Sequence, residues 1–309
     1  MTTPLGVLVM AYGTPHNLEE VLPYYTHIRH GRAPSDEQLA DLIRRYEAIG
    51  GVSPLTEITQ AQVRGLEQLL HADGGRDVSL YQGMKHIAPF IEDAVEQMYQ
   101  DGITEAVGIV LAPHYSKMSV GAYEKTALET AKKLGGPKFR FVHQWHMEPA
   151  FLDVLTARVG EALHLCANPK DAVVVFSAHS LPERILQTDD PYVRQLHESG
   201  EEVARRLQLN HYQFAWQSAG QTGEPWLGPD ILDVLRSLKE QGVKEVVSCS
   251  QGFVADHLEV LYDIDIEAKQ VAKELGIHLV RTRQMNDDPE FLRALRNAIR
   301  KCEQQGDVE

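Results

Sequence analysis

Cysteine is scarce in this chain, which has three copies in 309 residues and no Cys-x-x-Cys pair. Cys166, Cys249 and Cys302 are scattered, so by themselves they form neither a zinc knuckle nor an iron–sulfur site. Reduced thiols in the core or at the surface are the simpler interpretation. We therefore expect no iron–sulfur cluster and no permanently bound cofactor.

Long apolar runs are missing as well. No stretch approaches the roughly 18 to 20 apolar residues that a membrane-spanning helix needs. The first residues, Met-Thr-Thr-Pro-Leu-Gly, lack the basic segment and the apolar core of a signal peptide. We expect a cytoplasmic protein with no membrane partner.

Positive charge is in short supply. The chain has 30 basic and 44 acidic residues and a formal net charge of −14. Such a surface repels nucleic acid and anionic lipid over most of its area, so no nucleic-acid partner is expected. An anionic ligand would need a local cluster of basic side chains.

What the chain does have is a regular alternation of apolar runs and amphipathic stretches, in a length sufficient for two domains of about 150 residues each. Strands are predicted over 7–11, 78–83, 106–111, 139–143, 172–177, 211–216, 244–249 and 277–280. Helices are predicted over 17–30, 35–48, 56–72, 88–101, 120–134, 149–164, 190–208, 229–241, 255–275 and 288–304. This pattern predicts an α/β protein in which each half is a parallel sheet flanked by helices.

One apolar run delivers a histidine to the end of a strand. Residues 173–177 are apolar and largely β-branched up to Ser177, the run ends at Ala178-His179, and the chain turns at Pro182. Ligands of open parallel sheets bind just beyond the carboxyl ends of strands. On this segment alone, a ligand-handling His179 and a histidine that merely bonds a nearby carbonyl are equally supported.

An internal repeat favours the functional interpretation. The segment 7–15 follows the same pattern, and matching Ala11 with Ala178 places Tyr12 over His179. A second repeat relates 102–107 to 242–247. Two similar domains around a central cleft are predicted, with Tyr12 on one side and His179 on the other.

Carboxylates recur every four residues in the predicted helix over 255–275, at Glu259, Asp263 and Glu267. Side chains at this spacing lie on one side of an α-helix, where like charges repel by a few tenths of a kcal/mol per pair. A solvated helix face tolerates this repulsion. A track for cations would use it, because carboxylates with an imidazole suit ferrous iron.

Several segments together resemble the signatures of ferrochelatases, which insert ferrous iron into a porphyrin. They are Met10-Ala11-Tyr12-Gly13-Thr14-Pro15, residues 46–55, Ser177-Ala178-His179-Ser180-Leu181-Pro182, Gln217-Ser218-Ala219-Gly220, residues 225–229 and residues 252–263. The likeness extends over essentially the whole chain. It is greatest to the branch of Gram-positive bacteria that uses coproporphyrin III, because a tyrosine follows Met10-Ala11 and neither an apolar membrane lip nor a C-terminal cysteine cluster is present.

The resemblance implies a chelatase-like fold of two Rossmann-like domains. Residues 1–140 would form the domain with the porphyrin-binding helices. Residues 141–309 would carry the metal site, with the last helix free to pack back on the first domain. The family's metal-site pair corresponds to His179 and Glu259, and its axial tyrosine to Tyr12.

Positive charge and hydroxyls are needed for the four propionates of coproporphyrin. By resemblance, these contacts come from Arg29, Arg45, Tyr46, Ser53 and Tyr123. By resemblance, Lys85, His86 and Trp226 line the cleft. The alternatives are helix capping for His86 and loop packing for Trp226. Arg32 and Arg44 are interpreted as ordinary surface charge, and His30 stands where many relatives have another arginine.

The reaction needs a base, a weak metal ligand and a means of bending the macrocycle. His179 and Glu259 can each take either of the first two roles, and the sequence does not divide the roles between them. Asp263 and Glu267 would lead protons out or a cation in. His257 is not expected to be a ligand, and the serines beside His179 lack the Gly-x-Ser-x-Gly elbow of a hydrolase.

Two other functions compete with iron insertion into coproporphyrin III. A cobalt or nickel chelatase for another tetrapyrrole shares the fold but usually presents two histidines where this chain has His179 and Glu259. A haem-binding protein without turnover would use Tyr12 as a ligand, but it would leave the carboxylate series unexplained. With the resemblance we expect coproporphyrin III and Fe²⁺ as substrates, transient contact with other haem-pathway enzymes, and a monomer.

Overall fold

A computed structural model describes residues 4–220 and 222–305. By their contacts the residues form two compact units. The first takes in the chain up to Glu148 and from Asn286 onward, and the second runs from Pro149 to Met285. In the described part of the chain, no helix combines the length and the hydrophobicity that crossing a bilayer requires.

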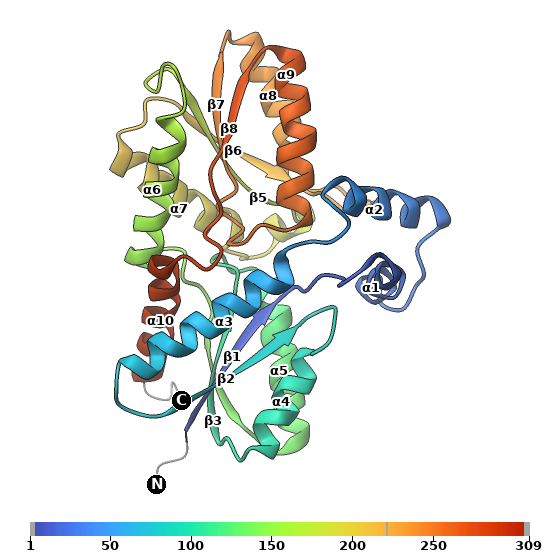
Figure 1. The fold of residues 1–309 in the computed structure, drawn as a ribbon, viewed down its shortest axis with the longest axis vertical. Helices are drawn as coiled ribbons and strands as arrows, with labels where there is room; N and C mark the ends of the chain where they lie inside the picture. Colours follow the sequence, from blue (N-terminus) through green and yellow to red (C-terminus); the bar gives the residue numbers. More distant parts are fainter. Residues whose placement is uncertain (1–3, 221, 306–309) are drawn as a thin grey trace. The chain divides into compact units, whose positions relative to one another are not determined.

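The first unit is built on a parallel sheet of four strands in the order β2-β1-β3-β4 (Figure 1). The strands are β1 (Leu5–Ala11), β2 (Val78–Met84), β3 (Glu105–Val110) and β4 (Lys138–Val142). The helices are α1 (Val21–Ile28), α2 (Asp36–Ala48), α3 (Leu55–Ala72), α4 (Ile91–Gln100), α5 (Val120–Leu134) and α10 (Pro289–Gln304), with a short 3₁₀ turn at Leu18–Glu20.

The second unit repeats this plan with the order β6-β5-β7-β8, again all parallel. Its strands are β5 (Val173–His179), β6 (Tyr212–Gln217), β7 (Glu245–Cys249) and β8 (His278–Arg281). Its helices are α6 (Pro149–Leu163), α7 (Tyr192–Leu207), α8 (Ile231–Glu240), the π-helix η3 (Val260–Ala268), α9 (Lys269–Leu275) and the 3₁₀ turn η2 (Glu183–Gln187).

The internal repeat seen in the sequence is a structural repeat. β1 and β5 take the same place in their two sheets, and β3 and β7 occupy the next place. Every residue of β1 is buried, as is every residue of β5 before His179. Burial on both faces is what a continuous apolar strand requires, so the predicted parallel sheets are confirmed.

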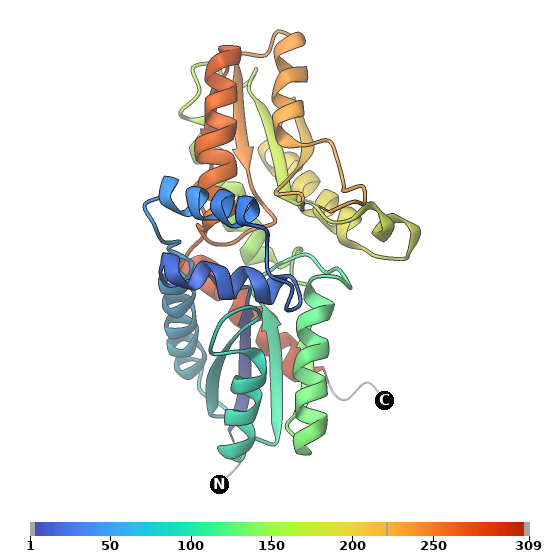
Figure 2. The ribbon, with the colours of Figure 1, turned by 90° about the vertical axis from the view of Figure 1, so that its right-hand side faces the viewer.

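Helices cover both faces of each sheet (Figure 1). In the first unit Leu8 and Met10 pack with α4 and α5, while α3 and α10 cover the other face. In the second unit Val173 and Val175 pack with α8 and with the helix that ends as α9. Among the helices of the first unit, α1 and α2 pack against each other (Figure 2).

One helix differs from its prediction. The predicted helix over 255–275 begins only at residue 258, and nine of its residues, Val260–Ala268, are in the π form. A π-helix forms i→i+5 hydrogen bonds and is rare beyond a single turn. The segment is therefore helical as predicted, but most of it is in the π form and not in the α form.

Candidate functional site

His179 is the last residue of β5, at the carboxyl edge of the second sheet. The turn after β7 lies directly against this end, because the Gly252 N–H donates to the carbonyl of Ser177 at 3.2 Å. A Cβ built on Gly252 would lie 2.4 Å from the Cβ of Ala178. Only glycine allows this close approach. The turn then leads into the helix that carries Glu259.

The imidazole of His179 faces the carboxylate of Glu259. Its Nε2 lies 3.5 Å from Oε1 of Glu259, and the two side chains are 33% and 35% exposed. Its Nδ1 contacts the carbonyl oxygen of Ser180, which orients the ring. The hydroxyl of Tyr192 donates to the His179 carbonyl at 3.0 Å. The rings of Trp226 and Phe253 each lie 6.3 Å from the imidazole.

The surroundings favour a protonated His179. Burial by itself would lower its pKa, but the carboxylate of Glu259, the Ser180 carbonyl and the more distant Asp263 carboxylate raise the pKa to about 9. At neutral pH the pair is an imidazolium beside a carboxylate. When His179 loses its proton, a metal cation bound by Glu259 can take over the positive charge. The site then carries no unbalanced negative charge in either state.

Asp263 meets the neighbouring strand. It is buried, and it accepts a hydrogen bond from the hydroxyl of Ser218, the residue after β6. Glu259 and Asp263 therefore face the ends of two adjacent strands, β5 and β6. Glu267 follows in the same π segment and is partly exposed.

The contact of Ser218 with Asp263 was not indicated by the sequence. The backbone φ of Ser218 is +59°, a left-handed conformation that costs energy for a residue with a side chain. Strained backbone conformations of this kind are concentrated at active sites and ligand-binding sites. The only signal in the sequence was the segment Gln217-Ser218-Ala219-Gly220, which carried a resemblance but no role.

A buried polar layer supports the strand ends. The Ser177 hydroxyl donates to Oε1 of Gln217 at 2.9 Å, and the Ser250 hydroxyl donates to the same atom at 3.2 Å. All three side chains are buried. Nδ1 of His257 accepts the N–H of Glu259 at 3.1 Å, so this ring caps the helix, and burial lowers its pKa.

The first unit gathers a second set of predicted residues at the carboxyl ends of β1 and β2. Tyr12 follows β1 and is 41% exposed. The centre of its ring lies 4.5 Å from the centre of the His86 ring. The backbone N–H of His86 donates to the Tyr12 carbonyl at 3.1 Å. The ammonium of Lys85 lies 4.8 Å from the centre of the Tyr123 ring. Burial lowers the pKa of Lys85.

His86 has a partner that the sequence did not indicate. Its Nδ1 lies 3.0 Å from Nδ1 of His27 on α1, so one ring donates and the other accepts. Burial, followed by the charges of Lys85, His27 and His30, lowers the pKa of His86 to about 3. The ring is therefore neutral at physiological pH.

The remaining predicted porphyrin contacts lie on and after α1 and α2. Arg29 lies over the Tyr25 ring at 5.6 Å. Arg45 donates from Nε to Asp41 at 3.0 Å, and the Tyr46 hydroxyl is 3.1 Å from that of Thr14. Ser53 is buried and accepts the N–H of Leu55 at the start of α3. Arg44 is exposed and pairs with Asp41 on its own helix.

Donors for a metal are few. Among the described residues, no group of three or more His, Cys, Asp or Glu side chains is placed to hold an ion. His179 and Glu259 offer two donors, which suits an ion in transit between water and a second ligand set better than a structural ion.

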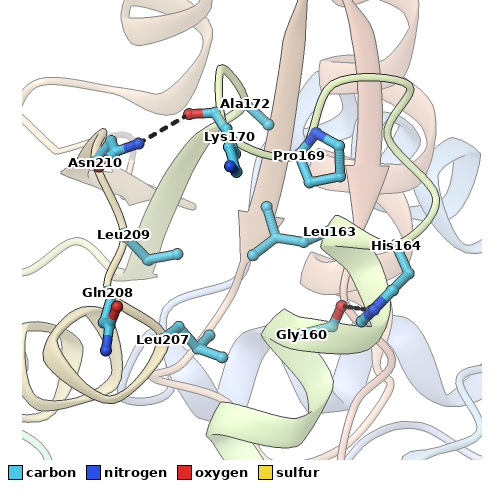
Figure 3. A pocket seen from close by; sticks show the side chains of 10 residues that line it. All are labelled: Gly160, Leu163, His164, Pro169, Lys170, Ala172, Leu207, Gln208, Leu209 and Asn210. Carbon is cyan, nitrogen blue, oxygen red and sulfur yellow. Dashed lines mark hydrogen bonds between the residues drawn. The ribbon is translucent and has the colours of Figure 1, made fainter.

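A hollow of about 240 Å³ lies elsewhere in the second unit, beside Ala172 just before β5 begins (Figure 3). Leu163, Leu207 and Leu209 line it. The described residues that line it include none of those predicted for the site. It lies at the opposite end of β5 from His179, about 20 Å away for a strand of this length.

Comparison with known proteins identifies relatives along the full length of the chain. The family model "Ferrochelatase" matches residues 4–303. A protein from Halalkalibacterium halodurans named coproporphyrin III ferrochelatase is 51% identical over 299 residues, which are 96% of each chain. A protein of the same name from Listeria monocytogenes is 50% identical over 304 residues, 97% of this chain and 98% of its own.

Solved structures share the fold at low sequence identity. The sirohydrochlorin chelatase SirB from Bacillus subtilis subspecies spizizenii, in complex with cobalt, has a TM-score of 0.61 at 12% identity, with 99% of this chain and all of that one covered. CbiX, the terminal enzyme of sirohaem biosynthesis in denitrifying bacteria, has a TM-score of 0.56 at 12% identity over 96% and 98% of the two chains. These likenesses confirm the predicted chelatase-like fold.

Proposed function

The chain belongs to the ferrochelatase family, and on this basis we propose that it inserts ferrous iron into coproporphyrin III and releases two pyrrole protons. The product, iron-coproporphyrin, would serve haem biosynthesis. Two relatives at 50% and 51% identity bear the name coproporphyrin III ferrochelatase, which supports this choice of porphyrin.

The observation that carries the proposal is the pair of His179 and Glu259, 3.5 Å apart at a strand end. In the resting state the pair holds a proton, because the pKa of His179 is raised to about 9. A ferrous ion that binds Glu259 repels this proton and frees the imidazole as a second ligand. After the ion passes to the porphyrin, His179 accepts one pyrrole proton and returns to its resting state.

The second pyrrole proton leaves through the acidic residues. Glu259 takes it up and passes it toward Asp263, which is held by Ser218, and toward Glu267. One proton leaves His179 when iron arrives and one leaves by this route, so two protons are released in each cycle. The same carboxylates would attract the incoming cation.

Residues of the first unit would hold the porphyrin. Tyr12 would serve as a ligand on the side of the first unit, and Arg29, Arg45, Tyr46, Ser53 and Tyr123 would bind the propionates. Lys85 lies over the Tyr123 ring, and this supports a site where both side chains would bind the same propionate. The ring of His86 packs against the ring of Tyr12. In the second unit, Trp226 lies near His179.

We also propose a cytoplasmic monomer without a resident cofactor or iron–sulfur cluster. Its ligands are coproporphyrin III and Fe²⁺, both as substrates. Contact with other enzymes of haem biosynthesis would be transient.

Anaerobic turnover tests the function. Purified protein is mixed with Fe²⁺ and with coproporphyrin III or protoporphyrin IX, and the Soret and Q bands are followed through many equivalents. We expect multiple turnovers, faster with coproporphyrin III. Uptake of one equivalent of finished haem without turnover would indicate a haem-binding protein, and a preference for cobalt with a reduced tetrapyrrole would indicate another chelatase.

A further inference from the structure

Arg281 lies at the same edge of the second sheet as His179, as the last residue of the outer strand β8. Its side chain is 14% exposed and contacts two aspartates. Nη1 lies 3.1 Å from Oδ1 of Asp256. Nε donates to Oδ2 of Asp265 at 2.9 Å, and Nη2 lies 2.8 Å from the same oxygen. One guanidinium therefore joins the turn before the helix to the middle of the π segment.

Two further contacts complete this cluster, which we call the Arg281 clamp: Arg281, Asp256, Asp265 and Lys269. Nη1 of Arg281 donates to the carbonyl of Thr282 at 3.2 Å. Nζ of Lys269 lies 2.6 Å from Oδ1 of Asp265, so both oxygens of this carboxylate contact a cation. The two aspartates are each 21% exposed, which limits the screening of the clamp by water.

The Arg281 clamp holds the π segment in a way that apolar packing does not. Ile264, Ala268 and Ala272 pack it onto the sheet, but apolar packing has little directional preference. Conversion of the π segment to the more favourable α form would turn the residues before it about the helix axis relative to those after it. Asp256 lies before the π segment and Asp265 lies inside it, and Glu259 lies between the two in the sequence. The hydrogen bond from Arg281 to Asp265 and the ion pair of the same guanidinium with Asp256 oppose the change.

We propose that Arg281 is a positioning residue for metal insertion, which keeps the π form and thereby holds Glu259 toward His179 and Asp263 toward Ser218. The inference rests on the proposed function. Arg281 acts through Asp256 and Asp265 and not through contact with iron or porphyrin. The reason for arginine is that one guanidinium reaches two aspartates with different nitrogens, whereas lysine at this position would present a single point charge.

The test compares Arg281→Gln with Arg283→Gln, a matched control two residues further on. Arg283 is 70% exposed and pairs with Glu161 of the same unit. We expect Arg281→Gln to lower kcat by about tenfold to a hundredfold, the range expected for a misplaced catalytic group. The affinity for coproporphyrin III, from porphyrin fluorescence, should change less than about twofold, since mainly residues outside the clamp are proposed to hold it.

A double-mutant cycle and a conservative variant separate positioning from general destabilisation. Asp265→Asn should reproduce the loss of kcat, and the double variant should be no slower than either single one. Arg281→Lys, the milder change, should give an intermediate kcat. Additive losses, a loss of porphyrin affinity in place of kcat, or normal turnover by Arg281→Gln would each overturn the proposal.

Hydrogen exchange gives a readout that does not depend on turnover. In Arg281→Gln the amides of Val260–Ala268 should exchange at least about tenfold faster than in Arg283→Gln, while those of β5 stay protected. If the unmodified protein has no chelatase activity but this difference is present, the proposed function fails and the clamp stands. Equal exchange in both variants would overturn the clamp.

Discussion

His179 contacts three other segments of the chain and its own neighbour Ser180. Glu259 faces its Nε2, the Ser180 carbonyl fixes its Nδ1, Tyr192 binds its carbonyl, and Trp226 lies beside its ring. The strand end was predictable from the apolar run before it. The bond to a nearby carbonyl was one of the two alternatives at this strand end, and Glu259 and Trp226 were named by resemblance. The contact with Tyr192 was not predicted, because residues apart in sequence meet only in the folded chain.

Replacement of His179 tests its role directly. His179→Ala should lower turnover by about 10²-fold to 10⁴-fold, the usual contribution of a general base, and leave coproporphyrin binding nearly unchanged. His211→Ala, at an exposed position after α7, serves as the control. Near-normal turnover would show that metal insertion does not need the His179 side chain. Loss of the folded state, measured by circular dichroism, would show that the histidine is structural.

At the scale of elements, the βα alternation was confirmed throughout, and one helix differed in kind. The π form of Val260–Ala268 cannot be read from periodicity, since its residues also fit an α-helical pattern. Contacts with neighbouring strands accompany it, through Ser218 to Asp263 and through Arg281 to Asp265. The carboxylates were correctly placed on one helix, but their directions depend on those strands.

The turn after β7 is the element that fixes the helix to the end of β5. In Gly252→Ala the new Cβ would lie 2.4 Å from the Cβ and 2.9 Å from the Cα of Ala178, where the strand backbone has no room to move. We expect a loss of about 1 to 3 kcal/mol in the free energy of unfolding, measured in urea, together with slower turnover.

Gly223→Ala is the matched control, because a Cβ there meets no described atom within 4 Å. It should change the free energy of unfolding by less than about 0.5 kcal/mol. Equal effects of the two substitutions would contradict the close approach at Gly252.

At the scale of the whole molecule, two sheets of the same strand order each carry their polar residues at the carboxyl edge. The first presents Tyr12, Lys85 and His86, and the second presents His179. The chain has 30 basic residues against 44 acidic ones, and Lys85 is a basic residue that lies at a strand end. A buried neutral histidine beside it makes the stability of the protein depend on pH.

His86 should reduce stability in acid. Its pKa is lowered to about 3 in the folded state, against an ordinary value near 6.5. Between these values the unfolded chain binds a proton at His86 that the folded chain does not. The free energy of unfolding should therefore fall as the pH drops from about 6 to about 4, by up to about 1.4 kcal/mol per pH unit for this side chain.

Denaturant unfolding of the unmodified protein and of His86→Gln measures this slope. The variant should lose less stability over the same pH range, although it is less stable at pH 7 because the contact with His27 is changed. His211→Gln, at an exposed position, should keep the original slope. Parallel curves for His86→Gln and the unmodified protein would contradict a neutral, buried His86.

The sequence by itself determined the two parallel sheets, their repeat and the strand ends that carry Tyr12 and His179, because burial of a strand on both faces leaves a continuous apolar run in the chain. Only the tertiary structure decided the π form of the carboxylate helix, the hydrogen bond from Ser218 to Asp263 and the pairing of His27 with His86. These features depend on directional contacts between distant segments. The sequence pattern shows which side chains lie on each strand or helix. The tertiary structure decides which of these side chains contact one another.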